Sequence, residues 1–229
     1  TMPGNDAVSL ASMGIYVFNK DFLVDVMNNP ETKDFGKEII PQAVGNKKML
    51  SYQYEGYWTD IGNIDSFFEA NIGLTDDLPK FNLFDNDNKI FTRPRLLPPT
   101  KFKKTSIDKS IFSDGCIINA KEIASSVIGS RSRIGSDTII HSTYVMGNDF
   151  YQNINDMEED VKNNKILMGI GERCFIKNTI VDKNCRIGND VHINGGKHLE
   201  NIANELYVIK DGIVVIKKGA IIPNNFTIK

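Results

Sequence analysis

The sequence contains little cysteine: Cys116, Cys174 and Cys185 are its only three, and they lie far apart. No C-x-x-C pair is present, so the spacing indicates neither a zinc site nor a disulfide framework and predicts reduced thiols in a cytoplasmic protein. No apolar run approaches the roughly 20 residues of a membrane span. The first ten residues lack the basic and apolar regions of a signal peptide, so no membrane association is expected.

An excess of charge of one sign is also missing. The chain has 27 Lys and Arg residues against 29 Asp and Glu residues, which gives a formal net charge of −2. Without a basic stripe or tail, no nucleic-acid partner is predicted. The three histidines, His141, His192 and His198, do not have the spacing of metal ligands and are interpreted as surface residues.

Residues 1–80 mix two kinds of hydrophobic pattern. Strands are predicted over residues 12–18 and 50–57, and helices over residues 20–27 and 64–74. The run from Met13 to Phe18 is nearly all apolar, which is typical of a strand buried on both faces. Strands that alternate with helices indicate part of an α/β layer structure. Residues 81–106 follow as an extended Pro-rich linker, which we expect to be ordered by burial of Leu96, Leu97 and nearby phenylalanines.

Residues 107–229 repeat an apolar residue about every six positions, often with a glycine directly after it. The repeated positions are Ile117 and Ile123; Ile128, Ile134, Ile140 and Met146; Ile170 and Ile176; Val181, Ile187 and Ile193; and Ile216, Ile222 and Ile228. A period of six fits neither an α-helix nor a simple strand. It fits a triangular coil in which each of three short faces points one aliphatic residue at the axis.

Two segments interrupt the repeat. Residues 148–165 are charged and helix-prone, which predicts a loop or short helix inserted at one corner of the coil, and residues 195–206 are a second candidate insertion. The alternative to the coil is an ordinary β-sandwich with irregular strands.

Seven strings follow one another in an order found in one family. They are SMGIYVF, DFGKEIIPQAV, YWTDIGNIDSFFEANIGL, FTRPRLLPPTKF, SVIGSRSRIG, YVMGNDFYQ and IVDKNCRIG. Along essentially the whole chain they resemble the signatures of glucose-1-phosphate adenylyltransferases (ADP-glucose pyrophosphorylases). W-x-D-x-G is shared by sugar nucleotidyltransferases at large, whereas D-F-G-x-E-I-I-P and L-P-P-T-K point to this member.

The resemblance implies a Rossmann-like catalytic domain, of which residues 1–80 are the C-terminal part, followed by a left-handed parallel β-helix over residues 107–229. It implies synthesis of ADP-glucose and pyrophosphate from ATP and glucose 1-phosphate, for glycogen or starch, with Mg²⁺. A phosphorylated effector, a homotetramer and a cytoplasmic location (plastidic in a plant) are also implied. Because G-G-x-G-T-R-L and F-x-E-K-P strings do not occur in this sequence, we expect a C-terminal portion that is inactive alone.

The resemblance makes Asp60, in Trp58-Thr59-Asp60-Ile61-Gly62, the catalytic residue and the second carboxylate of a metal site. Nucleotidyl transfer needs a divalent cation held by carboxylates, because charge develops on phosphate oxygens. From the residues alone, Asp60 could equally cap a turn before the helix predicted over residues 64–74.

A second set of residues is implied for binding glucose 1-phosphate: Ser12, Gly14, Tyr16, Asp34, Phe35 and Trp58. A carboxylate accepts hydrogen bonds from sugar hydroxyls, an aromatic ring packs on the sugar, and a glycine permits close approach to the backbone. Structural alternatives stay open: Asp34 could cap a helix together with Glu38, Trp58 could be a core aromatic, and Ser12 could serve packing alone.

A third set consists of cations that suit an anionic effector: Arg93, Arg95, Lys101, Arg131, Arg133, Lys183 and Lys218. Lys183 and Lys218 match lysines tied to activator binding in plant-like relatives, and solvated surface charge is the alternative. Two other functions are alternatives. A hexapeptide-repeat acyltransferase would need a catalytic histidine, for which no histidine here has a suitable setting. A non-catalytic regulatory subunit or fragment is disfavoured by the presence of Asp60, Asp34 and Ser12.

Overall fold

The structure is a computed structural model that describes residues 11–229. The chain divides into two compact units between Trp58 and Thr59. This division falls before the boundary expected near residue 80, because the helix after Asn63 packs within the second unit. Each unit is described by itself.

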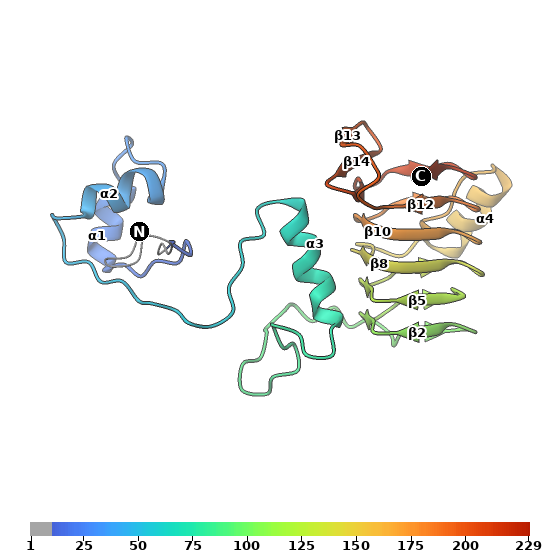
Figure 1. Cartoon of the computed structure of the whole chain (residues 1–229), viewed down its shortest axis with the longest axis horizontal. Helices are drawn as coiled ribbons and strands as arrows, with labels where there is room; N and C mark the ends of the chain where they lie inside the picture. Colours follow the sequence, from blue (N-terminus) through green and yellow to red (C-terminus); the bar gives the residue numbers. More distant parts are fainter. Residues whose placement is uncertain (1–10) are drawn as a thin grey trace. The chain divides into compact units, whose positions relative to one another are not determined.

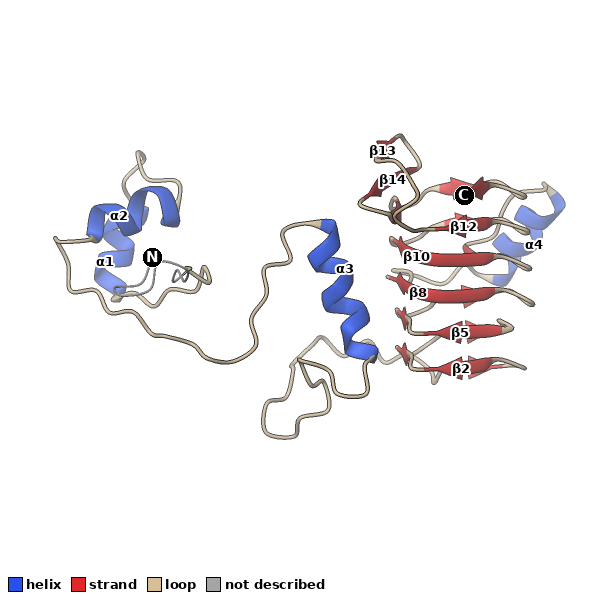
Figure 2. Ribbon diagram, viewed as in Figure 1, coloured by secondary structure: helices blue, strands red, loops and turns tan. Residues whose placement is uncertain are grey.

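The first unit contains two short α-helices, α1 (Lys20–Met27) and α2 (Ile40–Ala43), and a π-helical turn, η1 (Phe35–Ile39) (Figure 2). Helix α1 has the bounds that the sequence predicts. It begins after Asn19, whose side chain accepts a hydrogen bond from the Asp21 N–H at 3.0 Å and so caps the helix. Pro41 lies in the first turn of α2, where a missing N–H costs no helical hydrogen bond.

The strands predicted over residues 12–18 and 50–57 do not form, and residues 11–58 contain no strand. Ile15 is 72% exposed and Val17 is 98% exposed, so the prediction of a strand buried on both faces is wrong for this structure. A strand needs a neighbour that pairs with its N–H and C=O groups. The described residues of this unit provide no such neighbour.

The second unit contains a parallel β-helix with three faces, seen as stacked strands in Figure 1. The first face consists of β1 (Lys101–Phe102), β4 (Ile117–Ile118), β7 (Arg133–Ile134), β9 (Gly169–Ile170), β11 (Arg186–Ile187) and β16 (Ile221–Ile222). The second face consists of β2 (Ser106–Asp108), β5 (Glu122–Ala124), the first halves of β8 (Ile139–Val145) and β10 (Phe175–Val181), β12 (His192–Asn194) and β17 (Thr227–Ile228). The third face consists of β3 (Ile111–Phe112), β6 (Val127–Ile128), the second halves of β8 and β10, and β15 (Ile213–Ile216). The predicted triangular coil is confirmed, and the β-sandwich alternative is wrong.

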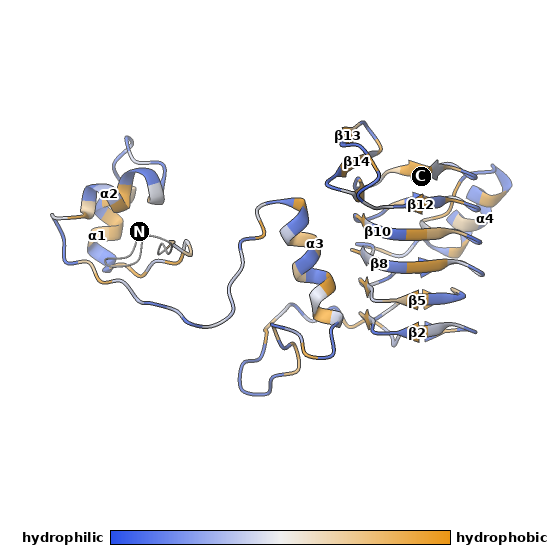
Figure 3. Ribbon diagram, in the orientation of Figure 1, coloured by the Kyte–Doolittle hydropathy of each residue, from blue (hydrophilic) through white to orange (hydrophobic). Residues whose placement is uncertain are grey.

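The core of the β-helix is a stack of isoleucines. Ile118 pairs with Ile134, sixteen residues later, and Ile123 pairs with Ile140, seventeen residues later, so one turn takes 16 to 17 residues. The side chains with less than 2% exposure include Ile123, Ile128, Ile134, Ile140, Ile176, Ile187, Ile193, Ile216 and Ile222. Each turn therefore buries its aliphatic residues against the turns before and after it. Figure 3 shows the result, strands that carry both hydrophobic and hydrophilic residues.

Two residues of the predicted inward set point elsewhere. Ile118, not Ile117, is the buried residue of β4, and Val145, not Met146, is the buried residue at the end of β8. The step between inward residues shortens from six to five at some corners, as from Ile118 to Ile123. Met146 packs outside the coil, against the cluster around Phe68.

The three cysteines are free and buried in the core of the coil. Burial raises the pKa of each thiol, that of Cys185 to about 11. They act as small core residues and not as nucleophiles.

The first insertion forms α4 (Ile154–Lys162), which contacts the first face at Arg133 and Arg186. We call residues 148–168 the strap. The Arg186 guanidinium binds the Asp160 carboxylate at 2.8 Å and the Ile166 carbonyl at 2.6 Å, which holds the strap on the coil. Gln152 donates to Asp160 at 2.5 Å. The second insertion forms β13 (Ile202–Ala203) and β14 (Tyr207–Lys210), and β14 pairs antiparallel with β15.

Helix α3 (Ile64–Ile72) covers part of the third face. Phe68 is buried together with Ile180 and Ile213, and the Phe67 ring lies 5.8 Å from the Tyr144 ring. A short 3₁₀ turn, η2 (Gly73–Thr75), ends the helix. The predicted helix is thus confirmed, and its apolar face packs on the β-helix.

The linker differs from its prediction. Leu96 is 95% exposed and Phe91 is 93% exposed, whereas Leu97 is half-buried. No described element packs over residues 90–96, so their apolar side chains find no surface to bury against. The chain joins the coil at Thr100, whose hydroxyl donates to the Ser113 carbonyl at 2.6 Å. None of the helices among residues 11–229 has the length and hydrophobicity of a membrane span.

Candidate functional site

Asp60 lies in a turn directly before α3. Its Oδ1 accepts a hydrogen bond from the Gly62 N–H at 2.9 Å, which fixes the carboxylate on its own backbone. The cap of α3 is a different residue, Asn63, which accepts a hydrogen bond from the Ser66 N–H at 2.8 Å. Asp60 therefore does not cap the helix, and it caps only the turn that precedes it.

The turn before α3 offers a metal ion one carboxylate, that of Asp60. Across residues 11–229, no group of three or more His, Cys, Asp or Glu side chains is arranged to hold a metal ion. Asp60 is exposed, and its Oδ2 makes no hydrogen bond within the described residues. This setting fits a single oxygen ligand for Mg²⁺, an ion that binds proteins through one or two carboxylates and takes its other ligands from water and phosphates.

Four of the residues predicted for sugar binding lie together in the first unit. The Ser12 and Tyr16 hydroxyls are hydrogen-bonded at 3.0 Å, and Ser12 Oγ also accepts from the Gly14 N–H at 3.2 Å. The Tyr16 ring stacks against the Phe35 ring, with their centroids 6.2 Å apart. Gly14 has φ 71°, a left-handed conformation that favours glycine. Hydroxyls beside aromatic rings are a combination suited to a sugar.

Asp34 caps a helical turn together with Glu38, which was the structural alternative to sugar binding. Its Oδ1 accepts a hydrogen bond from the Lys37 N–H at 2.8 Å, and Glu38 Oε2 accepts from the Lys33 and Asp34 N–H groups at 2.5 and 3.2 Å. This reciprocal cap fixes the turn that carries Phe35. Trp58 is 43% exposed, so it is not the core aromatic that was its alternative.

Three of the predicted effector cations share one corner of the β-helix. Gly115, Arg131, Gly147, Asn184 and Gly219 stack turn upon turn with positive φ, and Lys183 and Lys218 precede the last two. We call this the Arg131 corner. A Cβ at Gly147 would lie 2.2 Å from the Ser130 carbonyl oxygen, so this close stacking of turns requires glycine there.

Lys183 is already paired within the chain. Its Nζ lies 2.6 Å from Asp149 Oδ1, and Asn184 donates to Asp149 Oδ2 at 3.0 Å. These contacts, with that of Lys183 the larger, lower the pKa of the Asp149 carboxyl. The sequence analysis missed Asp149. Its place two residues after Gly147, at the start of the strap, was the only available signal.

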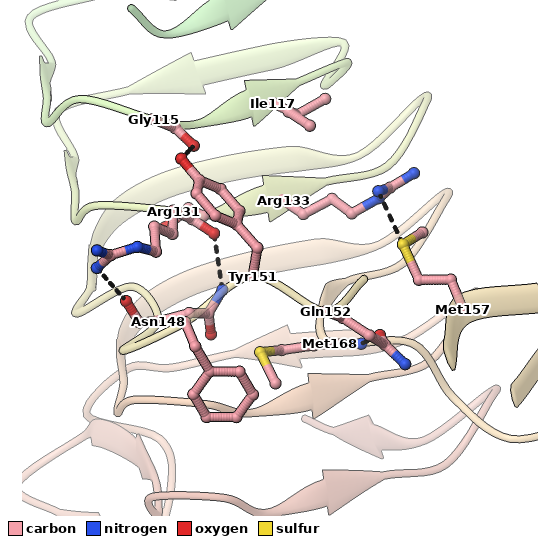
Figure 4. Close-up of a pocket in the computed structure, with 11 residues that line it drawn as sticks. Gly115, Ile117, Arg131, Arg133, Asn148, Tyr151, Gln152, Met157 and Met168 are labelled. Carbon is pink, nitrogen blue, oxygen red and sulfur yellow. Dashed lines mark hydrogen bonds between the residues drawn. The ribbon is translucent and has the colours of Figure 1, made fainter. Parts of the chain in front are cut away.

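A groove beside this corner contains Arg131 and Arg133 (Figure 4). The Arg131 guanidinium lies 5.6 Å from the Tyr151 ring centre and donates to the Asn148 carbonyl at 3.4 Å. The Tyr151 hydroxyl donates to the Gly115 carbonyl at 2.9 Å. Arg133 contacts the sulfur of Met157 at 3.5 Å. No carboxylate lines the groove, so it can accept an anion.

The other predicted cations come from the linker and from β1, and Lys101 is in register with Ile117 and Arg133 on the first face. Arg93 and Arg95 are exposed in the linker, where neither belongs to a helix or strand. Lys101 begins β1, with its N–H donating to the Cys116 carbonyl at 2.8 Å and its side chain exposed.

Two family models match the chain. The first, a GLGC left-handed parallel beta-helix domain, matches residues 95–227, and the second, a nucleotidyl transferase, matches residues 3–77. The first match covers more than half of the chain and gives the coil its handedness. The order of the two, a nucleotidyl transferase part followed by this particular β-helix, is the architecture expected from the sequence strings. The chain therefore belongs to the glucose-1-phosphate adenylyltransferase family.

Proposed function

We propose that the protein to which this chain belongs makes ADP-glucose and pyrophosphate from ATP and glucose 1-phosphate, for glycogen or starch synthesis. The observation that supports this is the occurrence in one chain of a nucleotidyl transferase match and a GLGC β-helix match. The nucleotidyl transferase match supports nucleotidyl transfer as the class of reaction. The proposal goes further in naming ATP and glucose 1-phosphate as the substrates.

Asp60 is the proposed catalytic residue and the proposed Mg²⁺ ligand. Its hydrogen bond from the Gly62 N–H leaves Oδ2 free and holds the carboxylate in one orientation. The ion, when bound, neutralises charge on the phosphate oxygens during transfer. A carboxylate held by its own backbone needs little reorganisation when it receives the ion.

The sugar is proposed to bind at Ser12, Tyr16 and Phe35, with Gly14, Asp34 and Trp58. The linked Ser12 and Tyr16 hydroxyls offer donors and acceptors, and the stacked Phe35 ring offers an apolar wall. The cap at Asp34 keeps Phe35 in place. These side chains would hold the sugar phosphate while the nucleotide is presented to it.

Regulation is proposed to act through the Arg131 corner, which would bind a phosphorylated metabolite. Arg131, Lys183 and Lys218 supply the charge, with Arg133 in the adjoining groove. Arg93, Arg95 and Lys101 are further candidates, on the linker and the first strand. An anion that binds Lys183 must compete with Asp149. A homotetramer in the cytoplasm completes the proposal.

The test is release of pyrophosphate by the full-length protein given glucose 1-phosphate and ATP, with UTP, GTP and dTTP as competitors. We expect ATP to be used best. Asp60→Asn is expected to lower kcat by a factor of about 10² or more, because charge neutralisation in the transition state is lost. Asp65→Asn, in the first turn of α3, is the matched control and should keep most of the activity.

Three results would contradict the proposal. Preference for another nucleotide would move the protein to a different nucleotidyltransferase reaction. Equal activity of the Asp60→Asn and Asp65→Asn variants would return Asp60 to its role in the turn. Binding of coenzyme A in place of ATP would favour the hexapeptide-repeat acyltransferase alternative.

A further inference from the structure

The outward side chains of the third face form an apolar strip across three successive turns of the β-helix. Tyr144 on β8, Ile180 on β10 and Val215 on β15 stand in register, each on a strand that pairs with the next. The residues that follow the first two, Val145 and Val181, belong to the core of the coil, so the strip faces outward. Burial of such a strip under another element is favourable in water.

Helix α3 covers this strip (Figure 1). Ile64, Phe68 and Ile72 are spaced four residues apart, which places them on one side of the helix. All three belong to the apolar cluster on this face of the coil, and Phe68 is only 9% exposed. Beside them, the Phe67 ring lies 5.8 Å from the Tyr144 ring. Because Ile64 and Ile72 are the first and last residues of α3, the contact fixes both the position and the direction of the helix.

A short, ordered link joins Asp60 to the beginning of α3. Asn63 caps the helix by accepting a hydrogen bond from the Ser66 N–H at 2.8 Å. The Gly62 N–H donates to Asp60 Oδ1 at 2.9 Å, which is the one hydrogen bond of this carboxylate within residues 11–229. Asp60 and Gly62 are both exposed, so the coil does not hold them directly. The orientation of the Asp60 carboxylate therefore depends on where α3 begins.

We propose that the β-helix positions Asp60 for nucleotidyl transfer through α3. Ile64, Phe68 and, on the coil, Tyr144 are the positioning residues. The inference rests on the catalytic role proposed above for Asp60. Transfer needs aligned reacting groups, and a displacement of about 1 Å can lower the rate about 100-fold. A coil with a fully buried aliphatic core is a rigid base for such a site, because closely packed turns do not shift independently.

A contact that served only stability would behave differently. Loss of the contact would then lower the fraction of folded protein, while each folded molecule kept its kcat. A positioning contact instead lowers kcat in molecules that remain folded, and its loss loosens the turn at Asp60. The two roles are therefore separated by measuring kcat and the turn in variants whose coil is intact.

The first test compares Phe68→Ala with Phe68→Leu in the full-length protein. Phe68→Ala removes most of the contact, and we expect kcat to fall about tenfold in the folded variant. The KM for glucose 1-phosphate should not change, because the residues proposed to bind the sugar belong to another unit. Phe68→Leu keeps an apolar side chain and should retain the parent kcat within about twofold. Circular dichroism at the assay temperature checks that the coil is folded in both variants.

Hydrogen exchange gives a measurement that does not depend on activity. The amides of residues 60–63 include the Gly62 N–H, which the Asp60 carboxylate protects. We expect these amides to lose protection about fivefold or more in Phe68→Ala, and to keep it in Phe68→Leu.

Phe226→Ala is the matched control. Phe226 packs against the core in the last turn of the coil, with its ring 5.9 Å from the Tyr207 ring, and it does not belong to the α3 cluster. The substitution removes the same kind of side chain without touching α3. It should leave kcat and the protection of residues 60–63 as in the parent protein, and effects equal to those of Phe68→Ala would contradict the inference.

A change on the coil side tests the contact without altering α3, and it also serves if Phe68→Ala does not fold. Tyr144→Ala removes the ring that Phe67 contacts. We expect Tyr144→Ala and Phe67→Ala each to lower kcat. The double variant should be no slower than the slower single variant, because all three lack the same contact. Effects that multiply in the double variant would mean that the two rings do not act together, against the inference.

The outcome for this inference is separate from the outcome for the proposed reaction. If the parent protein makes no ADP-glucose, the proposed reaction fails, and hydrogen exchange alone decides the inference. Loss of protection at residues 60–63 in Phe68→Ala and Tyr144→Ala, but not in Phe226→Ala, then supports positioning by the coil. A folded Phe68→Ala variant with unchanged kcat and unchanged protection would overturn it.

Discussion

In the β-helix, isoleucine after isoleucine is fully buried, whereas in residues 11–58 only Ile39 and Ala43 are buried. Both regions contain apolar runs, such as Met13 to Phe18 in the first and Ile213 to Ile216 in the second. The difference is where the partners of each run lie. A strand of the coil pairs with strands one turn away, 16 to 17 residues along the chain where no insertion intervenes.

This comparison shows how repetition makes a fold locally self-sufficient. Each turn supplies both the hydrogen-bond partners and the apolar surface that the next turn needs. A strand of an α/β layer depends instead on strands and helices that lie far away in sequence, because parallel strands are joined by long crossovers. Residues 11–58 have a capped helix, α1, and a capped π-helical turn, η1, but contain no strand.

The largest effect is expected from removing a core isoleucine of the coil. Ile140→Ala should lower the free energy of unfolding by about 2–5 kcal/mol, because the buried side chain leaves a cavity between tightly stacked turns. Ile15→Ala, at an exposed position of the first unit, should change it by less than about 0.5 kcal/mol. Urea unfolding followed by circular dichroism measures both. Similar losses for the two variants would break the comparison.

A smaller effect is expected at the cap of α3, since this helix depends on the coil. Asn63→Ala removes the acceptor of the Ser66 N–H and should lower the stability of the unit by about 1 kcal/mol. Asn19→Ala removes the equivalent cap of α1, a helix with no buried residue, and should leave the main unfolding transition unchanged. If both variants shift that transition equally, the two regions unfold as one.

The smallest global effect is expected at the strap. The hydrogen bond from the Arg186 guanidinium is the main reason why the pKa of the Asp160 carboxyl lies below its ordinary value of 3.8. A lowered pKa in the folded state means that this contact stabilises the strap above about pH 4 and is lost as the pH falls further. We expect the backbone amides of residues 150–165 to lose protection against hydrogen exchange, relative to the unfolded rate at the same pH, below pH 4 and in Asp160→Asn at neutral pH. Glu158→Gln, on the same helix, is the control, and equal exchange in the two variants would remove the role of the ion contact.

Much of the second unit follows from its sequence. The six-residue period predicts the coil and most of its inward residues. One apolar residue per face leaves few other registers in which the chain could bury these residues. The errors at Ile117 and Met146 arise where a corner takes one residue fewer, which depends on backbone conformation and not on hydrophobicity. The strap was predicted as an insertion. Its contact with the coil, between Asp160 and Arg186, joins residues 26 positions apart and leaves no pattern in the sequence.

The candidate site was predictable only in part. The strings predict Asp60 and the sugar-side residues by resemblance, which stays a prediction, whereas the capping pattern at Asp34 is confirmed. The helix cap at Asn63 was missed because an aspartate and an asparagine stand three residues apart before the same helix, and both are good caps. The grouping of Arg131, Lys183 and Lys218 at one corner emerges only when the turns are stacked.

The two insertions have a consequence for how such a chain can change. Ile134 pairs with Ile170 across the strap, 36 residues later, yet the next pair, Ile170 with Ile187, is again seventeen residues apart. The coil thus returns to its usual number of residues per turn directly after the insertion. Residues inserted at a corner leave the strand register of every later turn unchanged. New loops can therefore be acquired at the corners during evolution while the core of the coil stays the same.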